Sequence, residues 1–430
     1  MTDRGKEDLT ALRRLLHRHA ERGWEEFWTT AFVAASLERL GFSLRLGADA
    51  VEAASAMGRP DGKALARARE RALSWGADRA LIERLGDWTG LVALFDTGRP
   101  GPVTAFRFDL DAVETAECRQ AGHRPFDEGF ASLDETTAHA CGHDGHMAVG
   151  LALAGRIAAL APDLTGRIKL LFQPAEEGVR GGRAMTEKGH LDDVDVLFGF
   201  HLAGQFASGA VGAGCSDFLC TTKVDVAFRG VAAHAGMAPN EGKNALLAAA
   251  TAVLGLHAIA PHRDGASRVN VGVLRAGTGR NVVPDRAELL FETRGQTAAI
   301  DRYVYERALE VLDGAARSQG VSVETRLAGG AVDGTSHPDL VALVAEKARA
   351  VGFTDVSLEG RIGGSEDFSW MMRRVDERGG RACHFIVGAD RTAGHHNGRF
   401  DFDESVLPRA VDLFEALLRD RAGRGDDLRR

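Results

Sequence analysis

Histidine, cysteine and acidic side chains are concentrated in four short segments of this 430-residue sequence. The first segment, HACGHDGHMAVG, places five of them directly before an apolar helical stretch: His139, Cys141, His143, Asp144 and His146. A helix N-terminus lowers the pKa of a thiol, and a divalent metal would deprotonate it outright. Cys141 and His143 are therefore candidates to chelate one zinc-like ion, because such ions prefer sulfur and imidazole ligands. The alternative is a polar loop with a capping Asp144 and a buried Cys141.

Three further segments carry residues of the same types. Glu176 and Glu177 in QPAEEG follow a strand. Adjacent residues that leave a strand point in different directions, so one carboxylate could bind metal while its neighbour faces an attacking water. His201 in GFHLAG ends another strand, and His395 and His396 lie in the glycine-bounded loop AGHHNGRFDFDE. Each segment alone has an ordinary explanation, as solvated glutamates or structural histidines, but the set favours a metal centre.

The four segments together provide five ligands, enough for two metal ions if one ligand or a water bridges them: Cys141, His143, Glu177, His201 and His396. Glu176 then remains free as the general base that activates a metal-acidified water for hydrolysis. A different class of enzyme would use Cys141 as a nucleophile, with His143 or His146 as its base. A third interpretation is a binding subunit whose partner performs the chemistry.

The elements that must position these residues alternate between strands and helices from about residue 89. Four apolar runs predict buried strands: TGLVALFDTG, PVTAFRFDLDA, RIKLLFQPA and VDVLFGFHLA. The stretch MAVGLALAGRIAALA predicts a helix between two of them. This order indicates an α/β fold with a mostly parallel sheet, and such sheets build their sites where strands end and helices begin.

The order of elements changes from about Phe218 to β-α-β-β-α-β, which is the split βαβ arrangement of ferredoxin-like domains. Helices and strands of the first kind return after about Gly330. We therefore predict a catalytic domain of residues 1–217 and 330–430, interrupted by a smaller domain of residues 218–329. Residues 46–88 predict a helical excursion whose role the sequence alone does not indicate.

The composition excludes several classes of function. With 44% hydrophobic and 27% charged residues, most of the chain is expected to fold, and its length favours two domains. A net charge of −8 argues against binding nucleic acid or an anionic membrane through bulk charge. The charged N-terminus, the absence of a long apolar run and the odd number of five cysteines predict a soluble protein of the reducing cytoplasm.

Four motifs make a family resemblance specific: HACGHDGH, QPAEEG, GVAAHAGMAPNEGKNALLAAA and HHNGRFDFDE. Over nearly its whole length the chain resembles the metal-dependent aminoacylase and carboxypeptidase superfamily, metallopeptidase family twenty, in the branch of hippurate and indole-acetyl-amino-acid hydrolases. Longer stretches, including GADAVEAASAMGRPD and HAIAPHRDGASRVNVGVLRAGTGRNVVPD, are similar to the hydrolases of p-aminobenzoyl-glutamate within that branch.

The resemblance implies a metallopeptidase catalytic domain with an inserted ferredoxin-like lid and dimerisation domain. It further implies two divalent ions per subunit, Mn²⁺ or Zn²⁺. The implied reaction is hydrolysis of the amide bond of an N-acyl amino acid. The expected substrate is p-aminobenzoyl-glutamate, and the alternative is another, hippurate-like N-acyl amino acid. The subunit is expected to form a homodimer, or a heterodimer with a related subunit.

The family's metal ligands correspond to the five residues named above, and its general base corresponds to Glu176. His396 is favoured over His395 because it stands four residues before Phe400, as in the family's His-x-x-x-Phe pattern, although Asn397 replaces a frequent proline and leaves this choice open.

Further roles follow from the same resemblance. His234 is expected to polarise the scissile carbonyl in the active site of a partner subunit, while Asn281 and Arg294 hold the substrate carboxylate, for which the planar guanidinium is well suited. Asp109 and Asp111 would orient ligand histidines. The segment GGSEDF near Ser365 is expected only to cap a helix.

Overall fold

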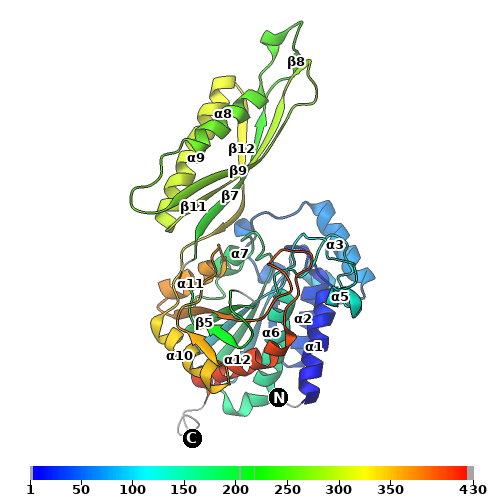
Figure 1. Ribbon diagram of the computed structural model, residues 1–430, viewed down its shortest axis with the longest axis vertical. Helices are drawn as coiled ribbons and strands as arrows, with labels where there is room; N and C mark the ends of the chain where they lie inside the picture. The colour runs from blue at the N-terminus through cyan, green and yellow to red at the C-terminus, as the bar shows by residue number, and fades with distance from the viewer. Residues whose placement is uncertain (1–2, 203–204, 217, 424–430) are drawn as a thin grey trace. The chain divides into compact units, whose positions relative to one another are not determined.

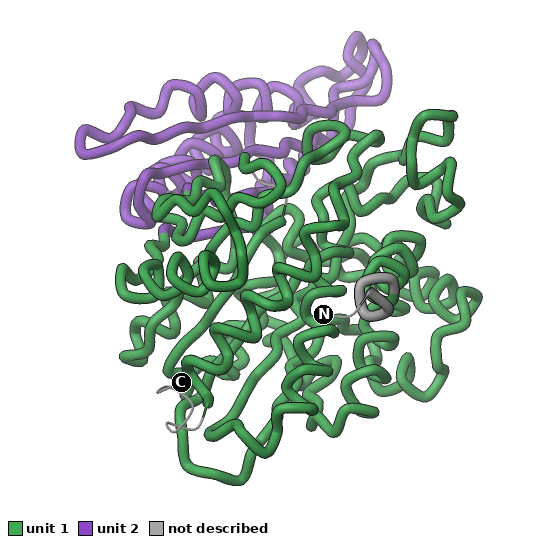
Figure 2. Tube along the Cα trace, turned by 60° about the horizontal axis from the view of Figure 1, so that its bottom comes forward, with its two compact units in different colours: residues 1–218, 334–430 green, residues 219–333 purple. Residues whose placement is uncertain are grey.

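The computed structural model describes residues 3–202, 205–216 and 218–423 of the chain (Figure 1). These form two compact units, which Figure 2 distinguishes by colour. Unit 1 comprises Met1–Phe218 and Gly334–Arg430, and unit 2 comprises Leu219–Asp333. The sequence predicts boundaries after residues 217 and 329. The second structural boundary lies later because the last strand of unit 2 continues to Ala331.

Unit 1 is built on an eight-stranded sheet with the order β1-β2-β4-β3-β5-β14-β6-β13. The four central strands β4, β3, β5 and β14 are parallel, which confirms the predicted α/β class with a mostly parallel sheet. The strands are β1 (Ser43–Leu46), β2 (Leu91–Asp96), β3 (Val103–Asp109), β4 (Arg167–Gln173), β5 (Val196–Leu202), β6 (Ala210–Gly212), β13 (Asp355–Ser357) and β14 (Arg381–Val387). The carboxyl ends of the parallel strands meet at one edge of the sheet, where the candidate residues lie.

Helices cover both faces of this sheet. The larger core joins one face to α1 (Asp3–Arg18), α2 (Phe27–Arg39), α6 (His143–Leu160), α10 (Pro338–Ala350) and α12 (Leu407–Ala422). The opposite face packs against α7 (Gly182–Glu187) and α11 (Phe368–Glu377). Phe106, Phe200 and Phe414 are fully buried in the larger core, so removal of their rings from water contributes strongly to the stability of unit 1. Residues of α3 (Gly62–Ser74) and α4 (Arg79–Leu85) also join the larger core, and α5 (Arg124–Asp127) is a short helix before α6.

A buried ionic network joins α1 to the start of α6. The Arg13 guanidinium contacts Asp144 at 2.7 Å. The His17 ring lies between two carboxylates, with Nδ1 2.7 Å from Asp144 and Nε2 2.9 Å from Glu117. Burial and the neighbouring Arg13 alone would lower the pKa of His17. The hydrogen bonds to both carboxylates outweigh these effects and raise the pKa to about 9. The doubly protonated ring donates both hydrogen bonds and so fastens α1 to the helix that follows Cys141.

This network predicts a loss of stability at alkaline pH. Because the pKa of His17 is raised from 6.5 to about 9 on folding, its contribution is fully present below pH 6.5 and is lost as the pH rises through 9. The free energy of unfolding, measured with urea between pH 6 and 10, should fall by on the order of 3 kcal/mol from this group. His17→Gln should remove that part of the pH dependence; an unchanged profile in the variant would contradict the assignment.

Unit 2 contains a four-stranded antiparallel sheet in the order β12-β7-β11-β9, with α8 and α9 packed on one face. Apart from the two short strands β8 and β10, its elements follow the predicted order β-α-β-β-α-β. They are β7 (Cys220–Arg229), β8 (Ala233–His234), α8 (Ala245–His257), β9 (Ser267–Ala276), β10 (Val282–Val283), β11 (Arg286–Gly295), α9 (Ala298–Gln319) and β12 (Ser322–Ala331). Within the described residues of both units, no helix is long and apolar enough to cross a membrane.

Candidate active site

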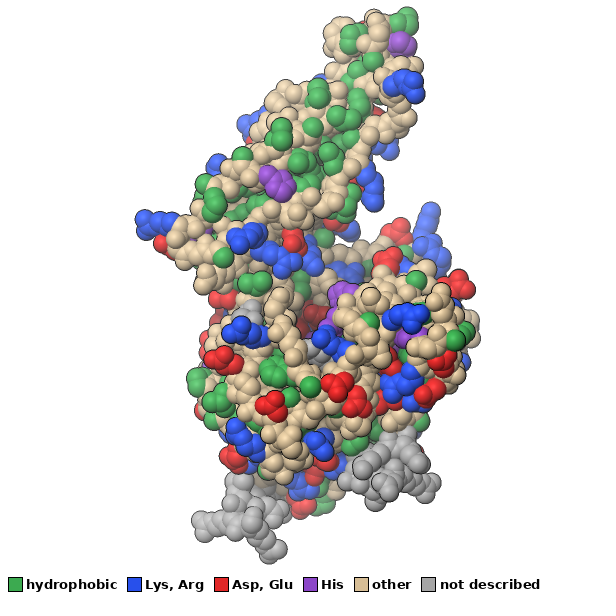
Figure 3. All heavy atoms as spheres, viewed as in Figure 1, with side chains coloured by type: hydrophobic (Ala, Val, Ile, Leu, Met, Phe, Trp, Pro, Cys, Tyr) green, Lys and Arg blue, Asp and Glu red, His purple; other side chains and the backbone are tan. Residues whose placement is uncertain are grey.

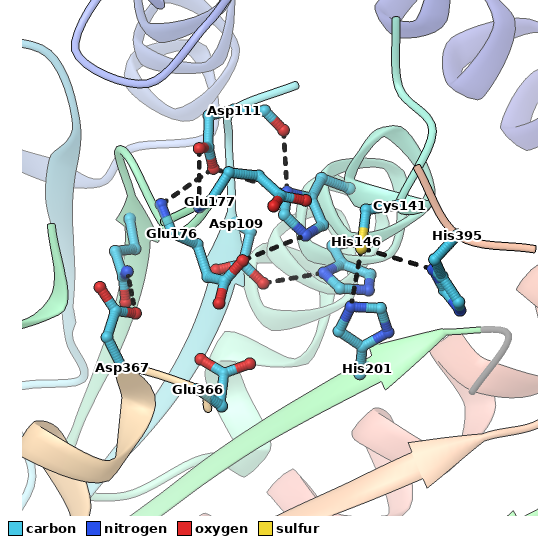
Figure 4. A network of polar contacts seen from close by, with 12 residues as sticks. Asp109, Asp111, Cys141, His146, Glu176, Glu177, His201, Glu366, Asp367 and His395 are labelled. Atoms are coloured by element: carbon cyan, nitrogen blue, oxygen red, sulfur yellow. Dashed lines mark hydrogen bonds and ion pairs between the residues drawn. The ribbon is translucent and has the colours of Figure 1, made fainter. Parts of the chain in front are cut away.

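The candidate residues converge at the carboxyl edge of the parallel strands in unit 1 (Figure 4). Histidine and acidic side chains are visible together at a recess in the surface of this unit (Figure 3). Cys141 and His143 come from the start of α6, His201 from β5, and the two glutamates from the turn of residues 174–182 after β4, here called the glutamate turn. The histidine pair lies in the loop between β14 and α12.

The five predicted ligands lie in two overlapping groups that share Cys141. Ligand atoms of Cys141, His143 and His201 all lie within 4.8 Å of one another, and so do those of Cys141, Glu177 and His396. The Cys141 thiol lies 3.5 Å from Nε2 of His201. Glu177 and His396 approach to 3.3 Å. The structure therefore brings all five together in an arrangement with room for two neighbouring ions.

The orientation of the rings suits metal ligation. His143 donates from Nδ1 to the Asp111 carbonyl oxygen at 2.8 Å, and His201 donates from Nδ1 to the Leu202 carbonyl oxygen at 2.7 Å. Such bonds fix the tautomer and leave a lone pair on Nε2. Nε2 of His143 and Oε1 of Glu177 are buried without a hydrogen-bond partner. Each of these two atoms belongs to one of the two ligand groups, so each fits as a ligand to a divalent cation.

The electrostatics of the cluster also favour a cation. Burial alone would lower the pKa of His143, but the hydrogen bond with Asp111 and the charge of Asp109 raise it to about 10. Burial alone would raise the pKa of Glu177, but its contacts with His396 and His143 lower it to about 2. The surrounding carboxylates thus stabilise positive charge at the position where a metal would replace the proton on His143.

His146, the third histidine of the first motif, is not free to bind metal or to serve as a base. Its Nδ1 contacts Asp109 at 2.9 Å, and its Nε2 accepts the Leu202 N–H at 3.0 Å. Burial, with further acidic groups nearby, raises the pKa of the Cys141 thiol well above its ordinary value. A nucleophilic cysteine requires the opposite shift, so the metal interpretation accounts for this cysteine better than the nucleophile interpretation does.

Both histidines of the terminal pair adjoin the cluster. His396 contacts Glu177, and its backbone is held at a φ of 63° with its N–H donating to the Ala140 carbonyl. His395 lies 3.4 Å from the Cys141 thiol and packs against the Phe400 ring. Only His396 of the pair belongs to a group of potential ligand atoms among the described residues, which favours His396 as the ligand.

Alanine substitution at each histidine is expected to separate their roles. His396→Ala should weaken binding of one of two metal ions by at least about tenfold. Loss of a direct ligand should lower the metal affinity at least as much as loss of a residue that only orients a ligand. His395→Ala should change the affinity less. Calorimetric titration of the two metal-stripped variants measures both effects, and the reverse order would make His395 the ligand.

The buried carboxyl group of Glu176 faces the same cluster. Its Oε2 lies 3.8 Å from Nε2 of His143. Burial, reinforced by the charges of Glu366 and Glu177, raises its pKa well above the ordinary value. Its backbone N–H and that of Glu177 both donate to the Asp111 carboxylate, at 3.0 and 2.9 Å. A raised pKa brings a carboxylate closer to the neutral range in which a general base is effective.

The two aspartates expected to orient ligand histidines differ in what they hold. Asp111 orients His143 through its carbonyl oxygen and fixes the glutamate turn through its carboxylate. Asp109 instead holds His146, which is not a ligand. Asp109 therefore does not orient a predicted ligand through a hydrogen bond. Its negative charge instead raises the pKa of His143.

Sequence reasoning missed a buried group behind Glu176. Glu366 accepts a hydrogen bond from the Phe368 N–H and so caps α11 as expected, but it also pairs with Arg107 at 2.9 Å. Carboxylate oxygens of Glu176, Glu366 and Asp367 lie within 4.8 Å of one another. The fully buried Arg107 neutralises part of this charge. The position of Arg107 between Phe106 and Phe108 in a predicted buried strand is the signal from which the group could have been found.

The N-terminal part of the 46–88 segment packs on the glutamate turn. The Glu52 N–H donates to the Ala184 carbonyl at 2.8 Å, and Nη1 of Arg180 donates to the Gly58 carbonyl at 3.4 Å. Val51 and Ala184 share a small apolar cluster with Trp24. This segment, to which the sequence assigned no role, therefore supports the turn that carries Glu176 and Glu177.

The residues predicted in unit 2 lie at its two ends. His234 and Asn281 are neighbours on the short strands, where the Ala235 N–H donates to the Asn281 carbonyl. Arg294 lies near the other end of β11, opposite Thr221, and its guanidinium contacts Glu292 at 2.7 Å. The eight residue-to-residue steps from Arg286 to Arg294 span about 26 Å of extended strand. One copy of unit 2 therefore does not bring Asn281 and Arg294, which are both expected to hold the substrate carboxylate, to a single carboxylate.

The geometry of unit 1 agrees with the relatives of this chain. Residues 105–420 match the family described as Peptidase family M20/M25/M40. The chain belongs to the M20 peptidase family. The YXEP protein of Bacillus subtilis, described as a dinuclear metal binding peptidase from this family, is 24% identical and shares the fold, with a TM-score of 0.64 over 97% of this chain and 98% of its own.

Two relatives and one solved structure are similar over nearly the whole chain. The indole-3-acetyl-aspartic acid hydrolase of Enterobacter agglomerans is 51% identical, and the alignment covers 94% of each chain. One of the subunits of p-aminobenzoyl-glutamate hydrolase from Escherichia coli is 50% identical over 94% of this chain and 93% of its own. The crystal structure of the aminobenzoyl-glutamate utilization protein from Klebsiella pneumoniae is 45% identical, covers 96% of this chain and 95% of its own, and has a TM-score of 0.83.

Proposed function

We propose that this M20 peptidase hydrolyses the amide bond between an aromatic acyl group and an acidic amino acid, with p-aminobenzoyl-glutamate as the first substrate to test. The observation that carries the proposal is the pair of orphaned atoms, Nε2 of His143 and Oε1 of Glu177, beside a separate buried carboxyl group at Glu176. The names of the two similar relatives supply the substrate class. In each name the substrate is an aromatic acyl group joined to aspartate or glutamate.

The five ligands Cys141, His143, Glu177, His201 and His396 would hold two divalent ions, Mn²⁺ or Zn²⁺. When bound, such ions acidify water and stabilise developing negative charge. Glu176 accepts a proton from the attacking water and later delivers it to the leaving amine nitrogen, so that the amide and water become a carboxylic acid and a free amino acid.

His234 is suited to donate a hydrogen bond to the scissile carbonyl oxygen. The backbone N–H groups of Gly236 and Met237 donate to its Nδ1 at 3.2 and 3.1 Å, which leaves the proton of the neutral ring on Nε2. We assign His234 to the active site of its dimer partner. Because Asn281 and Arg294 lie at opposite ends of unit 2, the carboxylate that both are expected to hold would be contacted by residues of two subunits. The assembly is then a dimer of like or related chains.

The location proposed for the protein is the cytoplasm. Within the described residues none of the five cysteines forms a disulfide bond, and Cys141 is required as a thiol or thiolate for the proposed metal centre. A reducing compartment preserves that state.

Purified protein should release glutamate from p-aminobenzoyl-glutamate after it is loaded with Mn²⁺ or Zn²⁺. Indole-3-acetyl-aspartate is the second candidate substrate, favoured by the similarity to the Enterobacter enzyme. Comparison of kcat/KM for these two compounds, hippurate and N-acetyl-glutamate separates the acyl preference from the amino-acid preference. Equal rates on all four compounds, or hydrolysis of hippurate alone, would contradict the proposed substrate class.

A further inference from the structure

Glu26 stands at the N-cap of α2 but does not cap the helix. An N-cap side chain normally accepts a hydrogen bond from one of the first backbone N–H groups of its helix. The Glu26 side chain makes no such bond. Glu21 takes its place, because its carboxylate accepts the N–H groups of Trp28 at 3.1 Å and Thr29 at 2.8 Å. The backbone N–H groups of Trp28 and Thr29 at the start of α2 are thus hydrogen-bonded without Glu26.

The Glu26 carboxylate reaches instead to the glutamate turn. Its Oε1 accepts the Ala175 N–H at 2.7 Å, and its Oε2 accepts the Thr89 hydroxyl at 2.6 Å. The side chain is fully buried, and this burial, reinforced by the charge of Asp111, raises the pKa of Glu26 well above its ordinary value. Burial of a polar side chain is unfavourable unless its polar atoms are hydrogen-bonded, and both oxygens of Glu26 accept hydrogen bonds, one of them from the glutamate turn.

The residue that Glu26 holds has a strained backbone. Ala175 adopts a φ of 51°, in the left-handed region that residues with a Cβ atom rarely occupy. The next two N–H groups, those of Glu176 and Glu177, donate to Asp111. Three consecutive N–H groups are thus bound by two buried carboxylates. Their combined geometry sets the directions in which the proposed base and the proposed metal ligand leave the backbone.

We propose that Glu26 is a positioning residue that holds Ala175 in its left-handed conformation and thereby aims Glu176 and Glu177 into the active site. This inference rests on the proposed function for the roles of the two glutamates. The contact with the Ala175 N–H does not depend on that function, so the two can be tested separately.

A matched set of variants distinguishes positioning from general stabilisation. Glu26→Ala removes the acceptor for the Ala175 N–H. Glu26→Gln keeps an oxygen for that N–H and can donate to the Thr89 hydroxyl, so it should preserve the contact. Glu21→Ala is the control, because it removes an equally buried carboxylate that accepts two backbone N–H groups on the same segment but does not touch the glutamate turn.

We expect Glu26→Ala to lower kcat by about tenfold to a hundredfold with little change in KM, the range typical of misplaced catalytic groups. Glu26→Gln should restore most of that loss. Glu21→Ala should lower the melting temperature but keep kcat within about twofold of the wild type. In metal-free protein, hydrogen exchange in a peptide covering residues 174–182 should be faster in Glu26→Ala alone.

Wild-type kcat and unchanged exchange in Glu26→Ala would overturn the inference, and so would an equal loss of kcat in Glu21→Ala. If the wild-type protein hydrolyses none of the four compounds, the proposed function fails. Two measurements made without substrate then still test whether Glu26 fixes the turn: hydrogen exchange and the affinity of each variant for Mn²⁺.

Discussion

Glu176→Gln is expected to lower kcat for p-aminobenzoyl-glutamate by about three orders of magnitude, while both metal ions remain bound. General base catalysis contributes on the order of 10²–10⁴-fold, and the amide keeps the shape of the side chain but cannot accept the proton. The variant should bind substrate with a KM close to that of the wild type. Steady-state assays of the metal-loaded proteins, together with metal analysis of the same samples, measure both effects.

Glu177→Gln is the control for this substitution. It alters the adjacent carboxylate of the same turn, whose Oε1 is one of the two orphaned atoms. This variant should lose metal affinity as well as activity, because a direct ligand is weakened. If Glu176→Gln also failed to retain metal, Glu176 would be a ligand rather than the base, and the division of labour between the two glutamates would be wrong.

Cys141→Ser is expected to abolish activity at micromolar metal and to regain a substantial part of it at millimolar Mn²⁺. Loss of a residue that merely orients a ligand already weakens metal binding by about 10–100-fold, so replacement of a thiolate ligand should weaken it by at least about 100-fold. Excess metal can compensate for weakened binding. The measurement is kcat as a function of metal concentration for the variant and the wild type.

The same titration decides between the two enzyme classes considered for this chain. A nucleophilic cysteine would form a covalent intermediate that serine at this position could not replace through added metal. Activity of wild-type protein that survives complete removal of metal, with a Cys141→Ser variant that no metal concentration restores, would support the nucleophile instead.

The fold was predictable because its strongest signals are periodic. The apolar runs that predict strands β2 to β5 are buried at almost every position along β3, β4 and β5, as expected for strands covered on both faces. The short strands β1, β6 and β13 were not predicted, since three or four residues carry too little periodicity to distinguish them from loops. The end of β12 at Ala331 was missed for a related reason, because its last residues include Gly329 and Gly330.

The candidate ligands were predictable from residue type, whereas their support was not. Cysteine, histidine and glutamate in short motifs predict a metal centre, and the structure brings these residues together. Glu26 and Glu366 lie 150 and 190 residues from Glu176 along the chain, and their contacts depend on the tertiary fold. Glu26 stands at the N-cap of α2 without making a capping bond, so its place in the sequence does not reveal its contact with Ala175.

The most direct test of the central claim is a metal titration of the stripped wild-type chain, in which bound ions per chain and glutamate released from p-aminobenzoyl-glutamate are measured in the same samples. We predict negligible release from the metal-free protein and full activity as two ions bind. Full activity without metal, or binding of two ions with no hydrolysis of any N-acyl amino acid by the assembled dimer, would contradict the account.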